Sequence, residues 1–437
     1  MASEPTFTLA LTGDSLITRR VSLDGHPQAV ALREMLHTAD VVFTNLESIP
    51  NDFVGDPVQD SGGDHLAAHS WVIDELVAMG CDLFATAHNH ALDYGVNGVL
   101  ATLERLNARG VSHAGLGRNL GEARMPVFHD TPLGNVALLS CSSSFGRGSQ
   151  AGEQRPDMQG RPGLNPLRTT TTHVVSADEL EQLRAVATRL GLEQRRLERL
   201  AFGFGAPPTD DVWTFGDMRF RVGDEPAIEQ VADERDLAAM TAWVHDARLR
   251  AAWVVVSLHA HEQGATKEDP AGFIPDFARR MIDAGADVVV GHGPHLLRGV
   301  ELYQGKPIFY SLGNFIEQHD LVYKHPADAY QRFGIDPALT HGQVAHLREA
   351  GGTKGFSIDR RYWQTVIPIC SFDGNTLTHV EVVPVALGFQ QPMHARGLPR
   401  IATGEEAVQI LSDLVRLSEP LGTQITIDGE RGWVEVL

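Results

Sequence analysis

The strongest constraint on the fold is an alternation of short apolar runs with amphipathic helical stretches. The apolar runs predict strands at residues 7–11, 41–44, 82–85, 136–140, 252–258 and 287–290. The helical periodicity predicts helices at residues 26–39, 71–79, 96–108, 237–249 and 273–284. Such alternation is typical of βα units and predicts an α/β fold with a mainly parallel sheet. Two further apolar runs, at 298–303 and 307–311, predict a change to antiparallel pairing and a core of two packed sheets.

The length of 437 residues and the 43% hydrophobic content predict one large domain spanning residues 1–437. Its expected core covers about 6–316 and 362–390, and a helix with strands follows at 400–437. Two insertions are expected, at 146–210 and 318–360. The first begins with a Gly- and Pro-rich loop at 146–172 and continues into a charged helix at 177–199. Because long loops inside a domain are often functional, we expect both insertions to cover a site.

The formal net charge of −20 argues against nucleic acid or an anionic membrane as a partner. Three widely spaced cysteines, Cys81, Cys141 and Cys370, show no pairing or zinc-thiolate spacing, which fits a reducing compartment. Met1–Pro5 has no basic region, and the apolar run that follows is too short for an export signal or a membrane span. These features predict a cytoplasmic location and leave the oligomeric state open.

Side chains that can bind a metal follow five of the predicted strands. They are Asp14, Glu47, Asn89 with His90, His259 with His261, and His292 with His295. Since the carboxyl ends of parallel strands meet at one edge of a sheet, we expect these side chains to converge. Asp14 alone is more typical of a turn or a helix cap, and a lone histidine is more often structural. The succession of five such motifs favours a metal site.

The motifs, in this order, resemble those of the CapA-type family, whose members take part in the synthesis of poly-γ-glutamate capsules. They lie between residues 7 and 315 and comprise Gly13-Asp14, Asn45-Leu46-Glu47, Asn89-His90-Ala91-Leu92-Asp93-Tyr94-Gly95, Ser257-Leu258-His259 and Gly291-His292-Gly293-Pro294-His295. Members of that family are similar to calcineurin-like metallophosphoesterases. The resemblance therefore implies a four-layer αββα sandwich of the metallophosphoesterase type, with long loop insertions and metals at the sheet edges.

The resemblance also implies roles for the motif residues. Glu47 would bridge two metals, with Asn89, His259 and His292 ligating one and Asp14 and His295 the other, while His90 would meet the substrate. One or two divalent ions per chain are expected, with Mn, Mg, Ca, Zn and Fe all open. This chain departs from the classical phosphoesterases at Leu16, where they carry the histidine of Asp-x-His, and its last motif is His-x-x-His where they have His-x-His.

A chain of this size without a membrane anchor resembles the CapA-like enzymes of peptide natural-product pathways, including a lasso-peptide epimerase. This resemblance implies a peptide substrate and L-to-D inversion at one Cα of a ribosomally made peptide. The candidate proton carriers are His90, His261 and His295. Candidate substrate-binding residues are Asp93, Asn314, Arg360 and Arg361.

The two arginines could hold a terminal carboxylate, although a surface role fits them equally well, and turn chemistry explains Gly313-Asn314 as well as a site does. A metal-dependent hydrolase of an amide or phosphoester is the first alternative function, and a non-catalytic metal-binding module is the second.

Overall fold

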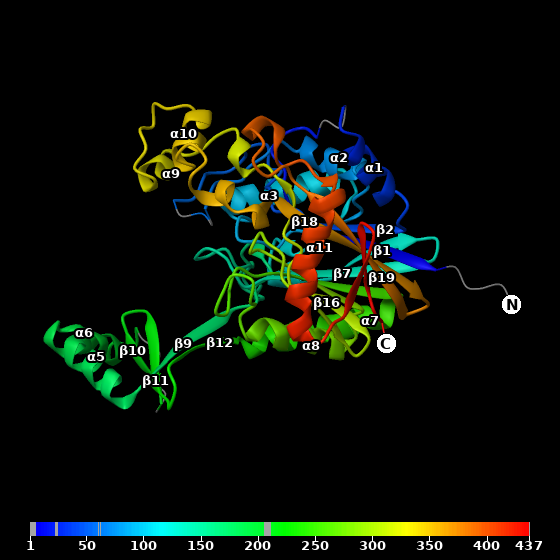
Figure 1. Ribbon diagram of the computed structural model, residues 1–437. Coiled ribbons are helices and arrows are strands. Elements are labelled where there is room, and N and C mark those ends of the chain that lie inside the picture. The colour runs from blue at the N-terminus through cyan, green and yellow to red at the C-terminus, as the bar shows by residue number, and fades with distance from the viewer. Residues whose placement is uncertain (1–5, 22–24, 60, 62, 205–210, 437) are drawn as a thin grey trace.

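Two β-sheets lie face to face in the body of this computed structural model, which describes residues 6–21, 25–59, 61, 63–204 and 211–436 (Figure 1). The first sheet has the order β21-β22-β19-β18-β1-β2-β3-β4, with β17 beside β1 and β20 beside β19. Its strands are β1 (Phe7–Leu16), β2 (Val41–Asn45), β3 (Leu83–Ala85), β4 (Ser112–Ala114), β17 (Asn314–Glu317), β18 (Gln364–Asp373), β19 (Thr376–Ala386), β20 (Arg400–Ile401), β21 (Ile425–Asp428) and β22 (Arg431–Val434).

The second sheet has the order β15-β16-β14-β13-β7-β6. Its strands are β6 (Val127–Thr131), β7 (Gly134–Ser142), β13 (Trp253–His259), β14 (Val288–His292), β15 (Val300–Tyr303) and β16 (Lys306–Phe309). β15 runs antiparallel to β16, as the sequence predicts, while β7, β13, β14 and β16 are parallel. A continuous apolar core joins the inner faces of both sheets, from Leu9 and Phe43 on one side to Val255 and Val290 on the other.

Helices cover the outer faces of the two sheets. Helices α1 (Pro27–Leu36), α2 (Trp71–Ala78) and α3 (Gly95–Ala108) pack on the first sheet, and α7 (Glu234–Arg250) and α8 (Phe273–Ala284) pack on the second. The apolar side chains of α11 (Gly404–Ser418) join the core between the sheets. This arrangement confirms the predicted αββα sandwich. The helices that the structure describes include none with both the length and the apolar character of a membrane crossing.

The first insertion continues to residue 232 and forms a separate arm that projects from the body (Figure 1). Its elements are β9 (Thr169–Val175), α5 (Ala177–Arg189), α6 (Leu192–Ala201), β10 (Trp213–Phe215), β11 (Met218–Val222) and β12 (Ala227–Ala232). The predicted single helix at 177–199 is wrong, because Gly191, at a φ of 70°, separates α5 from α6. The arm strands pair with one another in a sheet of their own, and residues 169–204 and 211–232 extend away from the sandwich.

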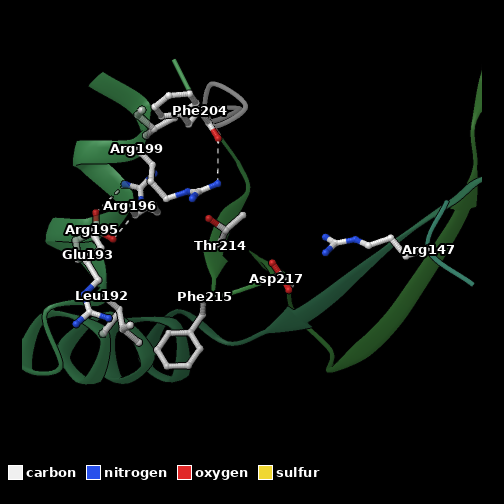
Figure 2. Close-up of a pocket in the computed structure, with 13 residues that line it drawn as sticks. Arg147, Leu192, Glu193, Arg195, Arg196, Arg199, Phe204, Thr214, Phe215 and Asp217 are labelled. Atoms are coloured by element: carbon white, nitrogen blue, oxygen red, sulfur yellow. Dashed lines mark hydrogen bonds and ion pairs between the residues drawn. The ribbon is translucent and has the colours of Figure 1, made fainter. Parts of the chain in front are cut away.

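A cavity of about 600 Å³ lies in the arm, between α6 and the β10–β11 turn (Figure 2). Arg195, Arg196 and Arg199 line it from α6, and Arg147 lies across from them. None of the predicted site residues lines this cavity.

A buried ion-pair cluster ties the base of the arm to the body. Asp236 of α7 is fully buried and pairs with Arg124 of α4 (Leu120–Arg124) and with Arg168, which directly precedes β9. The backbone N–H of Arg168 also donates to Asp236 at 3.0 Å. Both the charge and the hydrogen-bonding capacity of this carboxylate are therefore satisfied inside the protein.

The second insertion lies against the body and comprises η1 (His319–Leu321), α9 (Ala327–Arg332), α10 (His341–Arg348), η2 (Gly355–Ile358) and η3 (Arg360–Trp363). Arg348 of α10 pairs with Asp64, and the ring of Phe356 lies 5.7 Å from that of His295. This insertion therefore reaches the predicted site. The three cysteines are buried and unpaired, and Met1–Pro5, which bear on the expected absence of an export signal, lie outside the described residues.

Candidate metal centre

The structure brings the strand-end side chains of both sheets together at one edge of the sandwich. Asp14 and Glu47 come from the first sheet, and His259 and His292 are the last residues of β13 and β14 in the second. All four are at most 1% exposed. Asp14 lies inside β1 rather than past its end, at a point where the pairing register of β1 shifts against β2 and β17. Such an irregularity redirects a side chain without ending the strand.

Asp14 is held by groups from both sheets. Its Oδ1 accepts a hydrogen bond from Asn45 Nδ2 at 2.8 Å, and its Oδ2 accepts one from the Gly293 backbone N–H at 3.2 Å. The Nδ1 atoms of His292 and His295 lie 3.4 and 3.5 Å from its carboxylate oxygens. Burial alone would raise the pKa of Asp14, but the neighbouring imidazoles outweigh it and hold that pKa well below its usual range. Asp14 is therefore ionised and fixed in place.

Glu47 has an unsatisfied carboxylate at the middle of the cluster. Although it is fully buried, neither of its oxygens has a hydrogen-bond partner among the described residues. Its Oε1 lies 3.8 Å from Nε2 of both His259 and His295. Burial, and then the charge of Asp14, raises the pKa of Glu47 well above its ordinary value. A buried carboxylate left without a partner is costly unless a cation completes it.

Two groups of side chains in this cluster have the geometry to ligate a metal, and Glu47 belongs to both. One group is Asp14, Glu47 and His259, and the other is Glu47, His261 and His295, with the ligand atoms of each within 4.8 Å of one another. Both ring nitrogens of His292 and the Oδ1 of Asn89 are also buried without a hydrogen-bond partner in the described part of the chain. Imidazole and carboxylate donors around an unsatisfied core fit a divalent ion. The metal roles predicted for Asn89 and His292 stay predictions.

His261, predicted as a proton carrier, lies within the cluster. Its Nε2 is 3.1 Å from Nε2 of His259, and the ring of His295 is 5.3 Å from its own. Burial and the nearby His295 lower the pKa of His261 to about 3, so its imidazole is neutral. The geometry fits a metal ligand as well as a base.

His90 and Asp93 form a buried pair beside the cluster. His90 Nδ1 lies 2.9 Å from Asp93 Oδ2, which also accepts the backbone N–H of Leu66 at 2.9 Å. Burial alone would lower the pKa of His90, but the Asp93 carboxylate outweighs it and raises that pKa above its ordinary value. Asp93, predicted to bind substrate, therefore holds the orientation and charge of His90.

Asn314, predicted to bind substrate, is fully buried and contacts His295 instead of an open surface. Its Oδ1 lies 2.9 Å from His295 Nδ1, and its Nδ2 donates to Glu317 at 2.6 Å. His295 itself adopts a φ of 61°, in the left-handed region that non-glycine residues seldom occupy. Asn314 thus fixes the ring of a candidate ligand, as partners of metal-binding histidines commonly do.

The two predicted substrate arginines lie on η3 and are engaged with acidic residues. Arg361 pairs with Asp359 and Glu268, and Arg360 pairs with Asp413. Both side chains remain about two-fifths exposed, at 40% and 42%. Their role toward a substrate stays a prediction.

Asn45 and Glu317 belong to this site, although the sequence analysis gave no role to Asn45, which lies in the Asn45-Leu46-Glu47 motif, and did not single out Glu317. Asn45 links the two sheets, because its Nδ2 donates to Asp14 and lies 3.3 Å from His259 Nδ1. Its position at the end of β2, two residues before Glu47, was the signal that could have found it. Glu317 acts through Asn314, and no motif in the sequence marks it.

A four-layer αββα sandwich with an Asp, Glu and His cluster at its strand ends defines a protein of the metallophosphoesterase-like class. The bacterial capsule synthesis protein family PGA_cap matches residues 8–319. The chain belongs to this CapA-type family.

Relatives cover different shares of the chain. Two uncharacterized proteins of Sinorhizobium fredii, y4sH and y4uA, are each 35% identical over 442 residues, covering 98% of this chain and 93% of the relative. The PGA biosynthesis protein CapA of Bacillus subtilis is 25% identical over 58% of this chain and 47% of its own length. A probable polyglutamine synthesis accessory protein of Mycobacterium tuberculosis is 25% identical over 58% of this chain and 50% of its own length.

Proposed function

We propose that this chain is a metal-dependent enzyme that inverts an L residue to D at one Cα of a peptide by removing and returning a proton. The observation that carries the proposal is that one metal-competent cluster has an imidazole from the second sheet within it and an imidazole from the first sheet beside it. His90 follows β3 of the first sheet and is oriented by Asp93, whereas His261 follows β13 of the second sheet. Inversion needs one group that takes the proton from one face and another that returns it to the opposite face.

Asp14, Glu47 and His259, with His292 and His295 beside them, would hold the divalent ion. When bound, this ion supplies a Lewis acid for a carbonyl oxygen next to the reacting Cα. A neutral imidazole takes the proton as the Cα–H bond breaks, and the electron pair of that bond delocalises toward the carbonyl. The second imidazole then donates a proton to the other face, so the substrate keeps its composition.

The residue at position 16 supports inversion over hydrolysis. Leu16 is buried in an apolar cluster with Leu66 and Val322, where the classical phosphoesterases have a metal-binding histidine. The cluster therefore has one ligand fewer for the ion that would activate a water molecule in the classical two-metal reaction.

Hydrolysis of an amide or phosphoester is the second candidate, favoured by one observation. Glu47 is shared by both metal-competent groups, as a bridging carboxylate of a two-metal hydrolase would be. The names of the capsule-synthesis relatives specify no reaction. A peptide substrate fits both inversion and amide hydrolysis, and the net charge of −20 disfavours nucleic acid and anionic membranes as partners.

The test is incubation of the metal-loaded protein with candidate peptides in heavy water. Inversion predicts one deuterium at a single Cα, a gain of about one mass unit, and a mixture of L and D forms by chiral analysis. Hydrolysis instead adds the mass of water to the products. A chelator should abolish exchange and a divalent ion should restore it, and full activity in verified metal-free protein would overturn the proposal.

His90→Gln is the informative variant. As a general acid or base, His90 should contribute about 10²–10⁴-fold to the exchange rate. His245→Gln, on the exposed face of α7, is the matched control and should leave the rate unchanged. Equal rates for both variants would remove His90 from the mechanism.

A further inference from the structure

A groove of about 890 Å³ connects the arm to the metal centre. Its walls come from β12, from the loop that follows β13, and from the start of α8. The lining residues are Ile228, Glu229, Gln230, Val231, His261, Glu262, Gln263, Gly264, Ala265, Ala271, Gly272 and Asp276. His261 is also a member of the metal-competent group with Glu47 and His295. The groove is therefore continuous with the centre, unlike the arm cavity of Figure 2.

The wall formed by β12 is the edge of a sheet. The arm sheet has the order β10-β11-β9-β12, and β12 pairs only with β9 in the part of the chain that the structure describes. An edge strand presents backbone N–H and C=O groups that can pair with an added extended chain. Ile228 and Val231 on this strand are 68% and 62% exposed, so apolar side chains accompany the open edge.

The charges along the groove have one sign. Glu229, Glu262 and Asp276 line it, and its lining residues include no lysine or arginine. Glu262 accepts hydrogen bonds from Ser143 and Ser144 at 2.8 Å, and the guanidinium of the buried Arg298 donates to its backbone carbonyl at 2.9 Å. Glu229 is paired with Arg221, whereas Asp276 is exposed. The exposed Asp276 therefore favours a cationic occupant, while the arginines of the arm cavity favour the opposite charge.

We propose that this groove binds an extended, positively charged segment of the peptide substrate. The segment adds as a strand to the β12 edge, its basic side chains face Asp276, and a neighbouring residue reaches His261. The placement of a substrate residue at His261 rests on the proposed function. The binding of a cationic peptide to the groove can be measured without catalysis.

The test uses an end-blocked fluorescent octapeptide of alternating lysine and valine, with a glutamate–valine octapeptide for comparison. Fluorescence anisotropy on the full-length protein should show binding of the lysine probe only. Asp276→Lys should weaken that binding by roughly fivefold or more, since it replaces an attraction by a repulsion. Asp217→Lys is the matched control, because it makes the same charge reversal in the arm cavity, and should leave the dissociation constant unchanged.

Hydrogen exchange gives a second measurement that needs no variant. The lysine probe should slow exchange of backbone amides in residues 227–232. Equal binding of both octapeptides, an unchanged affinity in Asp276→Lys, or no protection in this segment would overturn the groove proposal. Deuterium incorporation at a peptide Cα would still stand in that case. Conversely, tight binding of the lysine probe together with no exchange at carbon would remove only the proposed inversion.

Discussion

Replacing Glu47 with Gln distinguishes two effects of this buried carboxylate: the stability that the folded protein loses by burying it, and its contribution to metal binding. Glu47 is fully buried, and its two oxygens have no hydrogen-bond partner within the described ranges. Without a cation, such a group resists ionisation, in keeping with its raised pKa. Gln has nearly the shape of the neutral acid, so it removes the ionisable group without opening a cavity. We expect the metal-free variant to be at least as stable as the wild-type protein.

The metal-bound protein should respond in the opposite way. An ion that binds only the folded state adds about 2.7 kcal/mol to the unfolding free energy at a concentration 100 times its Kd. Since loss of an indirect partner already weakens a metal site by roughly 10–100-fold, loss of the shared carboxylate should weaken it by about 100-fold or more. At the same ion concentration, metal binding would then raise the unfolding free energy of the Glu47→Gln variant by about 0.4 kcal/mol or less.

Urea unfolding with a chelator and with Mn²⁺ measures both quantities. Because the folded-state pKa of Glu47 is raised, the wild-type protein loses stability relative to the variant as the pH rises from the ordinary carboxyl pKa through that folded-state value. The advantage of the metal-free variant should therefore be larger at about pH 8 than at about pH 5. A variant more than about 1 kcal/mol less stable in chelator, or one that Mn²⁺ stabilises as much as wild type, would refute the reasoning.

Two further substitutions test the supports of the site and of the arm. Asp93→Asn removes the charge that raises the pKa of His90, so the limb of the exchange-rate profile that depends on protonated His90 should move to lower pH, and an unmoved profile would exclude this pairing. Asp236→Ala removes a fully buried carboxylate from Arg124, which is nearly buried, and from Arg168, which is 40% exposed, and should lower the unfolding free energy by about 3 kcal/mol in urea titration. Asp246→Ala breaks an exposed ion pair on the same helix and should cost about 0.5 kcal/mol or less, so similar losses in both variants would contradict the buried-cluster argument.

Local pattern was sufficient to predict most of the sandwich. β2, β13 and β14 are short apolar runs buried on both faces, and α8 has an apolar stripe at helical spacing, so each carries its own signal. The arm was harder to predict. Its strand β9 is the Thr-rich segment Thr169–Val175, which has little apolar character and lies partly in the stretch expected to be a loop. Its hydrogen-bonded pairing with β12, more than fifty positions away, stabilises β9 as a strand, although its own composition gives little strand signal.

The strand-end motifs alone predicted which chemical groups gather at the site, because parallel strands place their carboxyl ends at one edge of a sheet. The partners of these groups could be seen only in the folded protein. Asn45 meets His259 across 214 positions of chain, and Asn314 rather than a substrate occupies His295 Nδ1. The isolation of Glu47 and the groove beside β12 are likewise products of packing. These features arise from burial and hydrogen bonding between segments that are distant in the sequence. They depend on how the two sheets and the arm meet, and such contacts leave no periodic pattern in the chain.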